Sequence, residues 1–264
     1  MTKYSEIKSC TIGPAISAEQ FIPEHFFLFL AKGKMDGYDG SKNIALKDGE
    51  CCIVRRYRLA RYNKQKENDT FEKVIIIFDQ PFLKSFLQKY KTTLQYFRST
   101  EAFIKLKKDE KIVNYLLTLN TYFTSSGKID PIFCDLKREE LLLIILQQQP
   151  ELSGLFFDFS LPGKINLEEF MNRNFRFNVS LERFACMTGR SISAFKRDFK
   201  EIFKETPNRW LVQKRLEEAH FLLQKSGKTP SEIFMDLGFE DLSHFSFAFK
   251  KKFGKSPSEI EKIN

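Results

Sequence analysis

The sequence predicts two domains of different fold class: an amino-terminal α+β domain, built as a small β-sandwich or barrel followed by helices, and a carboxy-terminal all-α domain. At 264 residues the chain exceeds the usual size of one domain. Short apolar runs between Gly-containing turns fill the region before residue 79, which is typical of strands. From residue 166 onward the apolar residues recur only at helical spacing. The stretch from Pro150 to Lys164 contains Pro and Gly and predicts the boundary, giving domains of residues 1–160 and 165–264.

Five apolar runs predict the strands of the first domain. They are FFLFLA at 26–31, NIAL at 43–46, CCIV at 51–54, YRLARY at 57–62 and KVIIIF at 73–78. The Lys47-Asp48-Gly49 turn predicts that the second and third runs form a hairpin. We expect the fourth run to pair with the fifth across the polar loop at 63–70. Short strands at this spacing favour a sandwich or barrel, whose interior either holds a ligand or is filled by side chains.

Helices are expected after Asp79. Pro81 opens an amphipathic segment, and further helical patterns cover residues 109–123 and 133–149. The last of these contains LLLIIL at 141–146, six apolar residues that go most of the way round a helix. It therefore buries more than one face, either wholly within the core or partly against a second subunit.

The charge of the chain favours a polyanionic partner without identifying one. The net charge is +9 and the isoelectric point is about 9.2. Residues 165–264 carry 18 Lys and Arg against 14 Asp and Glu, a balance of +4, which leaves +5 for the remainder. Because the excess is spread over the chain, a claim of DNA binding must rest on sequence pattern.

The Cys and His residues predict no metal site, cofactor or catalytic centre. The five Cys, at 10, 51, 52, 134 and 186, are odd in number and form no C-x-x-C pair, which is typical of reduced cytosolic thiols. The three His, at 25, 220 and 244, are scattered. No apolar signal core and no run long enough to span a membrane occurs. We expect a cytoplasmic protein with no membrane partner.

Residues 180–204 predict a helix-turn-helix. Ser180 is a candidate N-cap and Gly189 a candidate C-cap for the helix between them. The second helix spans Ser191 to Lys204. Its expected inward residues are Phe195, Phe199, Ile202 and Phe203, and its expected outward residues are Ser193, Ala194, Lys196, Arg197 and Lys200. A tight turn between two short helices, the second with a basic outer face, is the pattern of a DNA-reading unit.

A long helix is predicted at 207–225, opened by Pro207. Nineteen residues span about 28 Å. This is close to the roughly 34 Å between successive major grooves on one face of B-DNA. The helix therefore has the length to hold two reading units about one turn of DNA apart.

The stretch 229–257 repeats the first unit at an offset of fifty residues. Eight positions are identical: Glu182 and Glu232, Phe184 and Phe234, Ser193 and Ser243, Phe195 and Phe245, Phe199 and Phe249, Lys200 and Lys250, Phe203 and Phe253, and Pro207 and Pro257. So many identities at helical spacing favour a duplicated unit over two unrelated hairpins.

The carboxy-terminal stretch resembles the signature of AraC-type (AraC/XylS) bacterial transcriptional regulators. The matching residues are Leu237-Gly238-Phe239, Ser243, Phe245, Phe249-Lys250-Lys251, Phe253-Gly254 and Ser256-Pro257, together with Arg215-Leu216 and Ala219. The resemblance covers residues 165–264. It implies two helix-turn-helix units joined by a helix, which place recognition helices at about 191–204 and 241–253 in adjacent major grooves.

The first domain resembles the regulatory half of such proteins, a cupin-like β-domain followed by helices that often dimerise. Its GYDG and LKDGE segments are similar to the subgroup that contains the regulator of a type III secretion system, which is controlled by a protein. The resemblance implies an activator whose partners are double-stranded promoter DNA, RNA polymerase, a second copy bound through the amino-terminal helices, and an effector that is a small molecule or a regulatory protein.

The resemblance also assigns DNA contacts. The implied base contacts are Ser193, Lys196 and Arg197 in the first unit and Leu242, Ser243, Ser246 and Phe247 in the second. Candidate phosphate contacts are Arg190, Lys200, Lys250 and Lys251. Phe247 departs from the family, where an Arg is usual. Because Phe donates no hydrogen bond, we expect the first unit to supply most of the sequence discrimination.

Two other functions fit parts of the pattern. A DNA-repair alkyl transferase with an AraC-like module would need an exposed Cys of low pKa, and no Pro-Cys-His context occurs. No G-x-x-x-x-G-K-[ST] phosphate loop is present either. The second alternative is a non-specific architectural DNA-binding protein, or a binding protein whose helix-turn-helix units serve only protein contacts. We therefore expect a regulator and not an enzyme.

Overall fold

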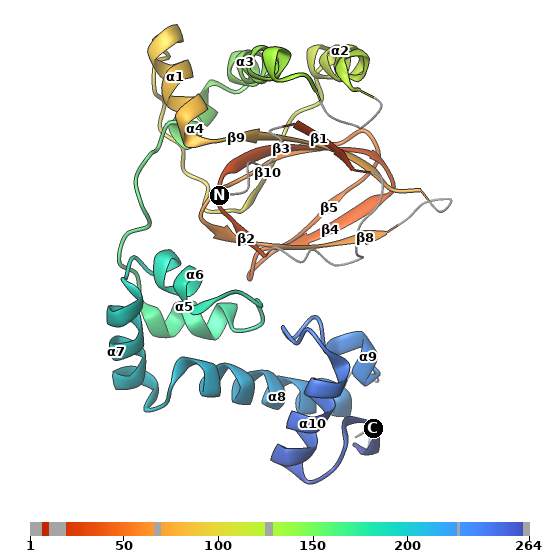
Figure 1. Ribbon diagram of the computed structural model, residues 1–264, viewed down its shortest axis with the longest axis vertical. Helices are drawn as coiled ribbons and strands as arrows, with labels where there is room; N and C mark the ends of the chain where they lie inside the picture. The colour runs from red at the N-terminus through yellow and green to blue at the C-terminus, as the bar shows by residue number, and fades with distance from the viewer. Residues whose placement is uncertain (1–6, 11–19, 66–69, 125–128, 226–227, 261–264) are drawn as a thin grey trace. The chain divides into compact units, whose positions relative to one another are not determined.

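The computed structural model describes residues 7–10, 20–65, 70–124, 129–225 and 228–260 (Figure 1). The chain divides into two compact units, Met1–Ser160 and Leu161–Asn264. Each unit has its own hydrophobic core, and the two are described separately. The prediction of an α+β domain followed by an all-α domain is confirmed.

The first unit is a β-sandwich of antiparallel strands. Its larger sheet has the order β1-β9-β3-β6-β10, with β1 at Ile7–Cys10, β9 at Glu72–Phe78, β3 at His25–Lys32, β6 at Cys51–Val54 and β10 at Phe103–Lys105. A smaller sheet has the order β5-β4-β8, with β5 at Asn43–Leu46, β4 at Lys34–Tyr38 and β8 at Arg61–Gln65. The short strands β2 (Phe21–Ile22) and β7 (Arg58–Leu59) pair with each other.

The larger sheet is covered on both faces, and this explains why β6 is continuously apolar. Cys51 and Ile53 pack with the helices on one face. Cys52 and Val54 pack on the other, with Met35 and Leu46 from the smaller sheet. All four residues of β6 are buried. A strand buried on both faces has no polar alternation to show in its sequence.

Both predicted strand pairings are wrong. The Lys47–Glu50 turn exists, with Glu50 N donating to Lys47 O at 3.0 Å, but it carries the chain from one sheet to the other. β5 pairs with β4 and β6 pairs with β3 and β10. The runs at 57–62 and 73–78 also lie in different sheets, because β8 pairs with β4 and β9 with β3. Part of the predicted loop, residues 66–69, lies outside the described residues.

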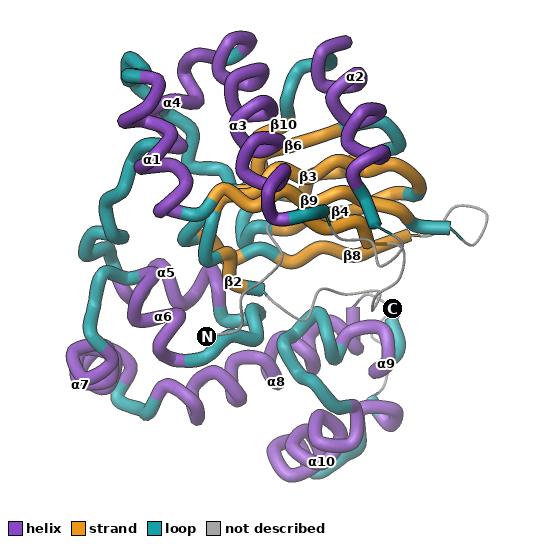
Figure 2. Tube along the Cα trace, turned by 45° about the horizontal axis from the view of Figure 1, so that its top comes forward, coloured by secondary structure: helices purple, strands orange, loops and turns teal. Residues whose placement is uncertain are grey.

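Helices cover the outer face of the larger sheet (Figure 2). They are α1 at Gln80–Tyr90, α2 at Glu110–Leu119 and α3 at Pro131–Gln148, with the short helices η1 (Asn120–Tyr122), η2 (Pro150–Leu152) and α4 (Ser153–Phe156) beside them. Asp79, Asp109 and Asp130 accept backbone N–H groups at the three N-caps. The three predicted helices are confirmed, and Leu141, Leu142 and Ile145 of α3 lie in the core.

The second unit contains only helices among its described residues. They are α5 at Leu167–Asn174, α6 at Leu181–Met187, α7 at Ile192–Phe203, α8 at Pro207–Lys225, α9 at Pro230–Ile233, α10 at Leu242–Phe253 and the 3-10 turn η3 at Pro257–Glu259. The helix pairs α6–α7 and α9–α10 form two helix-turn-helix units, and α8 joins them (Figure 1). This confirms the architecture expected for the carboxy-terminal domain.

Candidate nucleic-acid interface

The two second helices, α7 and α10, are copies in structure as well as in sequence. Each is twelve residues long, and their bounds differ by fifty positions at both ends. Ser191 and Asp241 cap their N-termini by accepting backbone N–H groups. Lys204 and Gly254 end them in the left-handed conformation. Both helices are anchored by two fully buried Phe, at 195 and 199 and at 245 and 249.

Arg215 of α8 links the two helix-turn-helix units, both of which lie in the carboxy-terminal domain. Its side chain is buried, and its guanidinium donates to the carbonyl oxygens of Phe175 at 2.7 Å, Phe177 at 2.8 Å and Gly238 at 2.9 Å. Gly238 has a φ of +83°, and a Cβ there would meet this guanidinium. Burial lowers the pKa of Arg215 to about 10, so the group stays charged at neutral pH. One side chain thus joins the turn before α6 to the turn before α10.

The sequence placed Arg215 in a motif but missed this role. A signal was present, because Arg215 stands four residues from both Leu211 and Ala219, which are buried on α8. A charged residue in an apolar stripe is costly to bury unless every donor finds a partner. Such a position predicts a buried cross-link, although the three acceptors come from residues far away in the sequence.

The outer face of α7 presents the first set of candidate contacts. Ser193, Lys196, Arg197 and Lys200 are all exposed. The guanidinium of Arg197 is held on one side by Asp198, whose Oδ1 accepts from Nη2 at 3.0 Å. Asp198 also accepts from Arg190, and these two arginines hold the pKa of its carboxyl below its usual range. An oriented Arg with free donors is suited to the O6 and N7 atoms of guanine.

Two residues of the first helix-turn-helix, Ile202 and Arg190, have an exposure that the sequence did not predict. Ile202 is 42% exposed instead of buried, and the aromatic contacts with Trp210 are made by Phe199 at a centroid distance of 5.5 Å and Phe203 at 4.6 Å. The side chain of Arg190 is only 8% exposed. It donates to Asp198, Thr188 O and Ile165 O, so in this structure Arg190 cross-links the turn. Its assignment to phosphate stays a prediction.

The outer face of α10 presents the second set. Leu242, Ser243, Lys250 and Lys251 are exposed, and Phe247 is 69% exposed. Ser246 is half-buried and donates its hydroxyl to Leu242 O at 2.8 Å. Lys252, which the sequence did not single out, is bound to Glu217 and to Gln213 O of α8. The cations of α10 therefore gather in its last turn.

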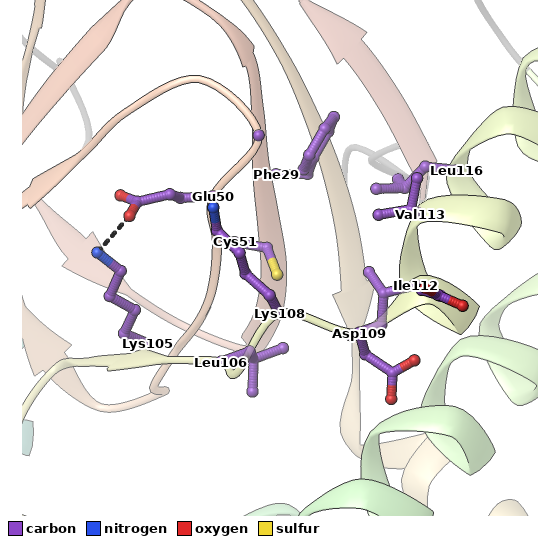
Figure 3. Close-up of a pocket in the computed structure, with 12 residues that line it drawn as sticks. Phe29, Glu50, Cys51, Lys105, Leu106, Lys108, Asp109, Ile112, Val113 and Leu116 are labelled. Carbon is purple, nitrogen blue, oxygen red and sulfur yellow. Dashed lines mark ion pairs between the residues drawn. The ribbon is translucent and has the colours of Figure 1, made fainter.

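The amino-terminal unit, Met1–Ser160, contains a cavity of about 400 Å³ between α2 and the larger sheet (Figure 3). Phe29, Cys51 and Leu106 line it from the sheet side, and Ile112, Val113 and Leu116 line it from α2. Lys105 and Glu50 form an ion pair at 2.6 Å among its polar residues. The lining is mostly apolar, so the cavity suits an apolar molecule.

The two neighbouring thiols of β6, Cys51 and Cys52, are buried. Burial raises the pKa of the Cys51 thiol to about 12 and raises that of Cys52 further. A thiol that stays protonated is a poor nucleophile. Among the described residues no cluster of His, Cys, Asp and Glu could hold a metal ion. No described helix has the length and apolarity needed to cross a membrane.

Comparison with known families matches both units of the chain. Residues 25–155 match the model of the ExsA N-terminal regulatory domain, and residues 184–263 match a helix-turn-helix domain model. The chain belongs to the AraC family of transcriptional regulators. Within the family it is a DNA-binding regulator with an amino-terminal regulatory domain.

Individual relatives agree with this assignment. The chain is 24% identical over 244 residues to the virulence regulon transcriptional activator VirF of Yersinia enterocolitica, covering 87% of this chain and 86% of that protein. It is 24% identical over 235 residues to the regulator ExsA of Pseudomonas aeruginosa, covering 87% and 83%. The activator RhaS of Escherichia fergusonii is 33% identical over 120 residues, covering 45% and 42%. These relatives are transcriptional regulators and not enzymes.

Proposed function

We propose that this AraC-family chain binds promoter DNA sequence-specifically by placing α7 and α10 in successive major grooves on one face of the duplex. One observation carries the proposal. Two copies of the same capped helix, each with an exposed outer face, are joined by the single nineteen-residue helix α8 and locked by Arg215. The span of α8, about 28 Å, approaches the roughly 34 Å groove repeat.

Base reading in this proposal is unequal between the helices. Ser193, Lys196 and Arg197 of α7 offer hydrogen-bond donors to base edges. The exposed ammonium groups of Lys200, Lys250 and Lys251 hold phosphates, which fixes the register of the protein on the duplex. Sequence discrimination through hydrogen bonds therefore comes mainly from α7.

A binding assay separates this function from architectural DNA binding. The full-length chain is titrated with duplexes selected from a random pool and with unselected duplexes, at one fixed salt concentration. We expect selection to enrich a two-part site that binds about a thousandfold or more tightly than random DNA. Equal affinity for all duplexes would support the architectural alternative instead.

We further propose that the protein acts in the cytoplasm as a homodimer and activator that contacts RNA polymerase. The names of VirF and RhaS describe activators, which supports that sign of regulation. For the dimer, the support is an exposed apolar stripe along α3, formed by Ile132, Leu136 and Leu143, and Leu117 of α2 is a further exposed apolar residue. These positions repeat at helical spacing on the side away from the core.

Control enters through the amino-terminal unit in this proposal, by a small molecule or by a regulatory protein. The cavity beside α2 is the place for a small apolar molecule. Val113 both lines the cavity and is exposed on α2, one turn before Leu117 of the proposed dimer face. We therefore expect an occupant of the cavity to affect that face. Replacing Leu116 with Trp fills the cavity and is expected to change the dimer dissociation constant. An unchanged dimer dissociation constant would show that the cavity does not influence dimerisation.

A further inference from the structure

The offset of fifty residues gives an internal comparison between the two candidate reading helices. Position 247 of α10 corresponds to position 197 of α7, and position 246 corresponds to position 196. Arg197 and Lys196 are thus replaced by Phe247 and Ser246. The backbone has been duplicated, while the two cations best suited to guanine have been lost from the second copy.

Among the polar groups that remain near Phe247, His244 is exposed about one turn before it, with its ring 6.1 Å from that of Phe239. The Ser246 hydroxyl is used within the helix, since it donates to Leu242 O at 2.8 Å. The counterpart of Asp198, which orients Arg197, is Ala248. The second helix therefore keeps neither the cation nor the carboxylate that holds it. Ser243 is the exposed hydroxyl that the two helices share, as the counterpart of Ser193.

At the position that corresponds to Arg197, α10 presents an apolar side chain. Phe247 is 69% exposed, and Leu242, one turn before Ser246, is exposed as well. A phenyl ring in water is costly compared with one that is covered on binding. On the edges that base pairs show in the major groove, the one apolar group is the C5 methyl of thymine.

We propose that α10 recognises thymine methyl groups through Phe247, so that the second half of the DNA site is defined by thymine where the counterpart in α7 would read guanine. This inference rests on the proposed function. Lys250 and Lys251 in the last turn hold the phosphates beside it, and the ring of Phe247 covers the methyl group. The two helices then read different half-sites by different chemistry.

Uracil substitution tests this directly, because uracil lacks only the methyl group. Using the selected duplex and the full-length chain, each thymine of both strands is replaced by uracil in turn. We expect the dissociation constant to rise about fourfold, the effect of one buried methyl, at one or two thymines of a single half-site. Phe247→Ala should bind more weakly and lose this penalty, whereas Phe247→Leu should keep part of it.

Three further results decide the inference. Phe221→Ala, which removes another exposed Phe from α8, should leave the uracil penalty unchanged. Phe247→Arg should shift selection from thymine to guanine at the same position. Circular dichroism should show unchanged folding for each variant, because the replaced ring is exposed.

The possible failures are distinguishable. If selection enriches a site but uracil is tolerated at every thymine, or if Phe247→Ala keeps the wild-type penalty, the thymine inference is wrong and the regulator function stands. If selection enriches no site, the proposed function itself fails and takes the inference with it.

Discussion

At the scale of single residues, Arg215 is the side chain on which the helical unit depends most. Its guanidinium donates to the backbone carbonyl oxygens of Phe175, Phe177 and Gly238. Arg215→Met keeps the apolar stem and removes the donors. We expect the free energy of unfolding of this unit to fall by about 3 kcal/mol or more, since buried polar groups lose their partners.

The single Trp of the chain reports this loss. Trp210 packs against Phe199 and Phe203 in the same unit, so its fluorescence in urea follows that unit alone. Arg209→Met is the matched control on the same helix, because Arg209 is exposed and makes only a surface pair with Glu205. We expect a change within about 0.5 kcal/mol for the control. Equal midpoints for the two variants would contradict the cross-linking role.

His25 predicts how the stability of the β-sandwich depends on pH. Its ring is buried, its Nδ1 accepts from Arg56 N, and its Nε2 has no described partner. Burial first, and then Arg56, Arg55 and Arg58, lower its pKa from 6.5 to about 3. The folded state therefore holds His25 neutral where the unfolded state would bind a proton. Stability is full above pH 6.5 and falls as the pH drops from 6.5 toward 3.

Urea unfolding measured by circular dichroism at pH 7 and pH 5 checks this dependence. The contribution of His25 should be about 2 kcal/mol less stability at pH 5. His25→Asn can still accept the Arg56 N–H without titrating, so this variant should lose that part of the difference. A variant with the wild-type pH dependence would show that other groups cause it.

At the scale of elements, α7 and α10 should respond differently to the loss of a cation. Arg197→Ala is expected to cost about 1 to 3 kcal/mol at the selected site and to relax one base position, because the lost donors read a base. Lys251→Ala should reduce the salt dependence by about one charge without changing preference. Titrations of both variants on selected and random duplexes over several salt concentrations measure this. Uniform weakening by Arg197→Ala on every sequence would refute its base-reading role.

How much could be predicted differs between helices and strands. The bounds of α7 and α8 follow from local signals: a Ser cap, Phe at helical spacing, and Pro207 at the start of the next helix. Strand pairing is not local. The Asp48-Gly49 turn is present, yet it joins two sheets, because the four buried residues of β6 require a central place between two strands. The sequence did contain a sign against a simple hairpin, because the run CCIV is apolar throughout and does not alternate with polar residues.

The candidate site divides in the same way. Outward positions such as Lys196 and Arg197 could be predicted from helical period alone, and the structure places them on the exposed face. The engagement of Arg190 could not, because its partners Ile165 O and Asp198 are brought to it by the fold. The residue type alone does not predict whether a basic side chain is exposed when the fold brings distant hydrogen-bond acceptors to it.

At the scale of the whole molecule, the proposed function assigns DNA binding to the helical unit and the control of DNA binding to the sandwich unit. The helical unit carries the duplicated helices α7 and α10, which we propose to read DNA. The sandwich unit carries the apolar cavity and the apolar stripe of α3. The LLLIIL run of α3 fits both alternatives, burial in the core and contact with a second subunit. Leu141 and Leu142 are buried in the core, while Leu143 is exposed. An apolar stripe that faces water is stabilised when a second copy covers it.

The stripe makes the last prediction specific. Leu136 is 58% exposed on α3, and a symmetric dimer through this face would bury it twice. Burying a Leu side chain contributes about 2 kcal/mol, so Leu136→Lys should weaken the dimer roughly a hundredfold or more. Light scattering after gel filtration should give the mass of one chain for this variant where the wild type gives two. Leu94→Lys, at an exposed position outside α2 and α3, is the control and should remain dimeric. A wild type that stays monomeric at every concentration would reject the dimer. A Leu136→Lys variant that stays dimeric would place the interface on another face of the molecule.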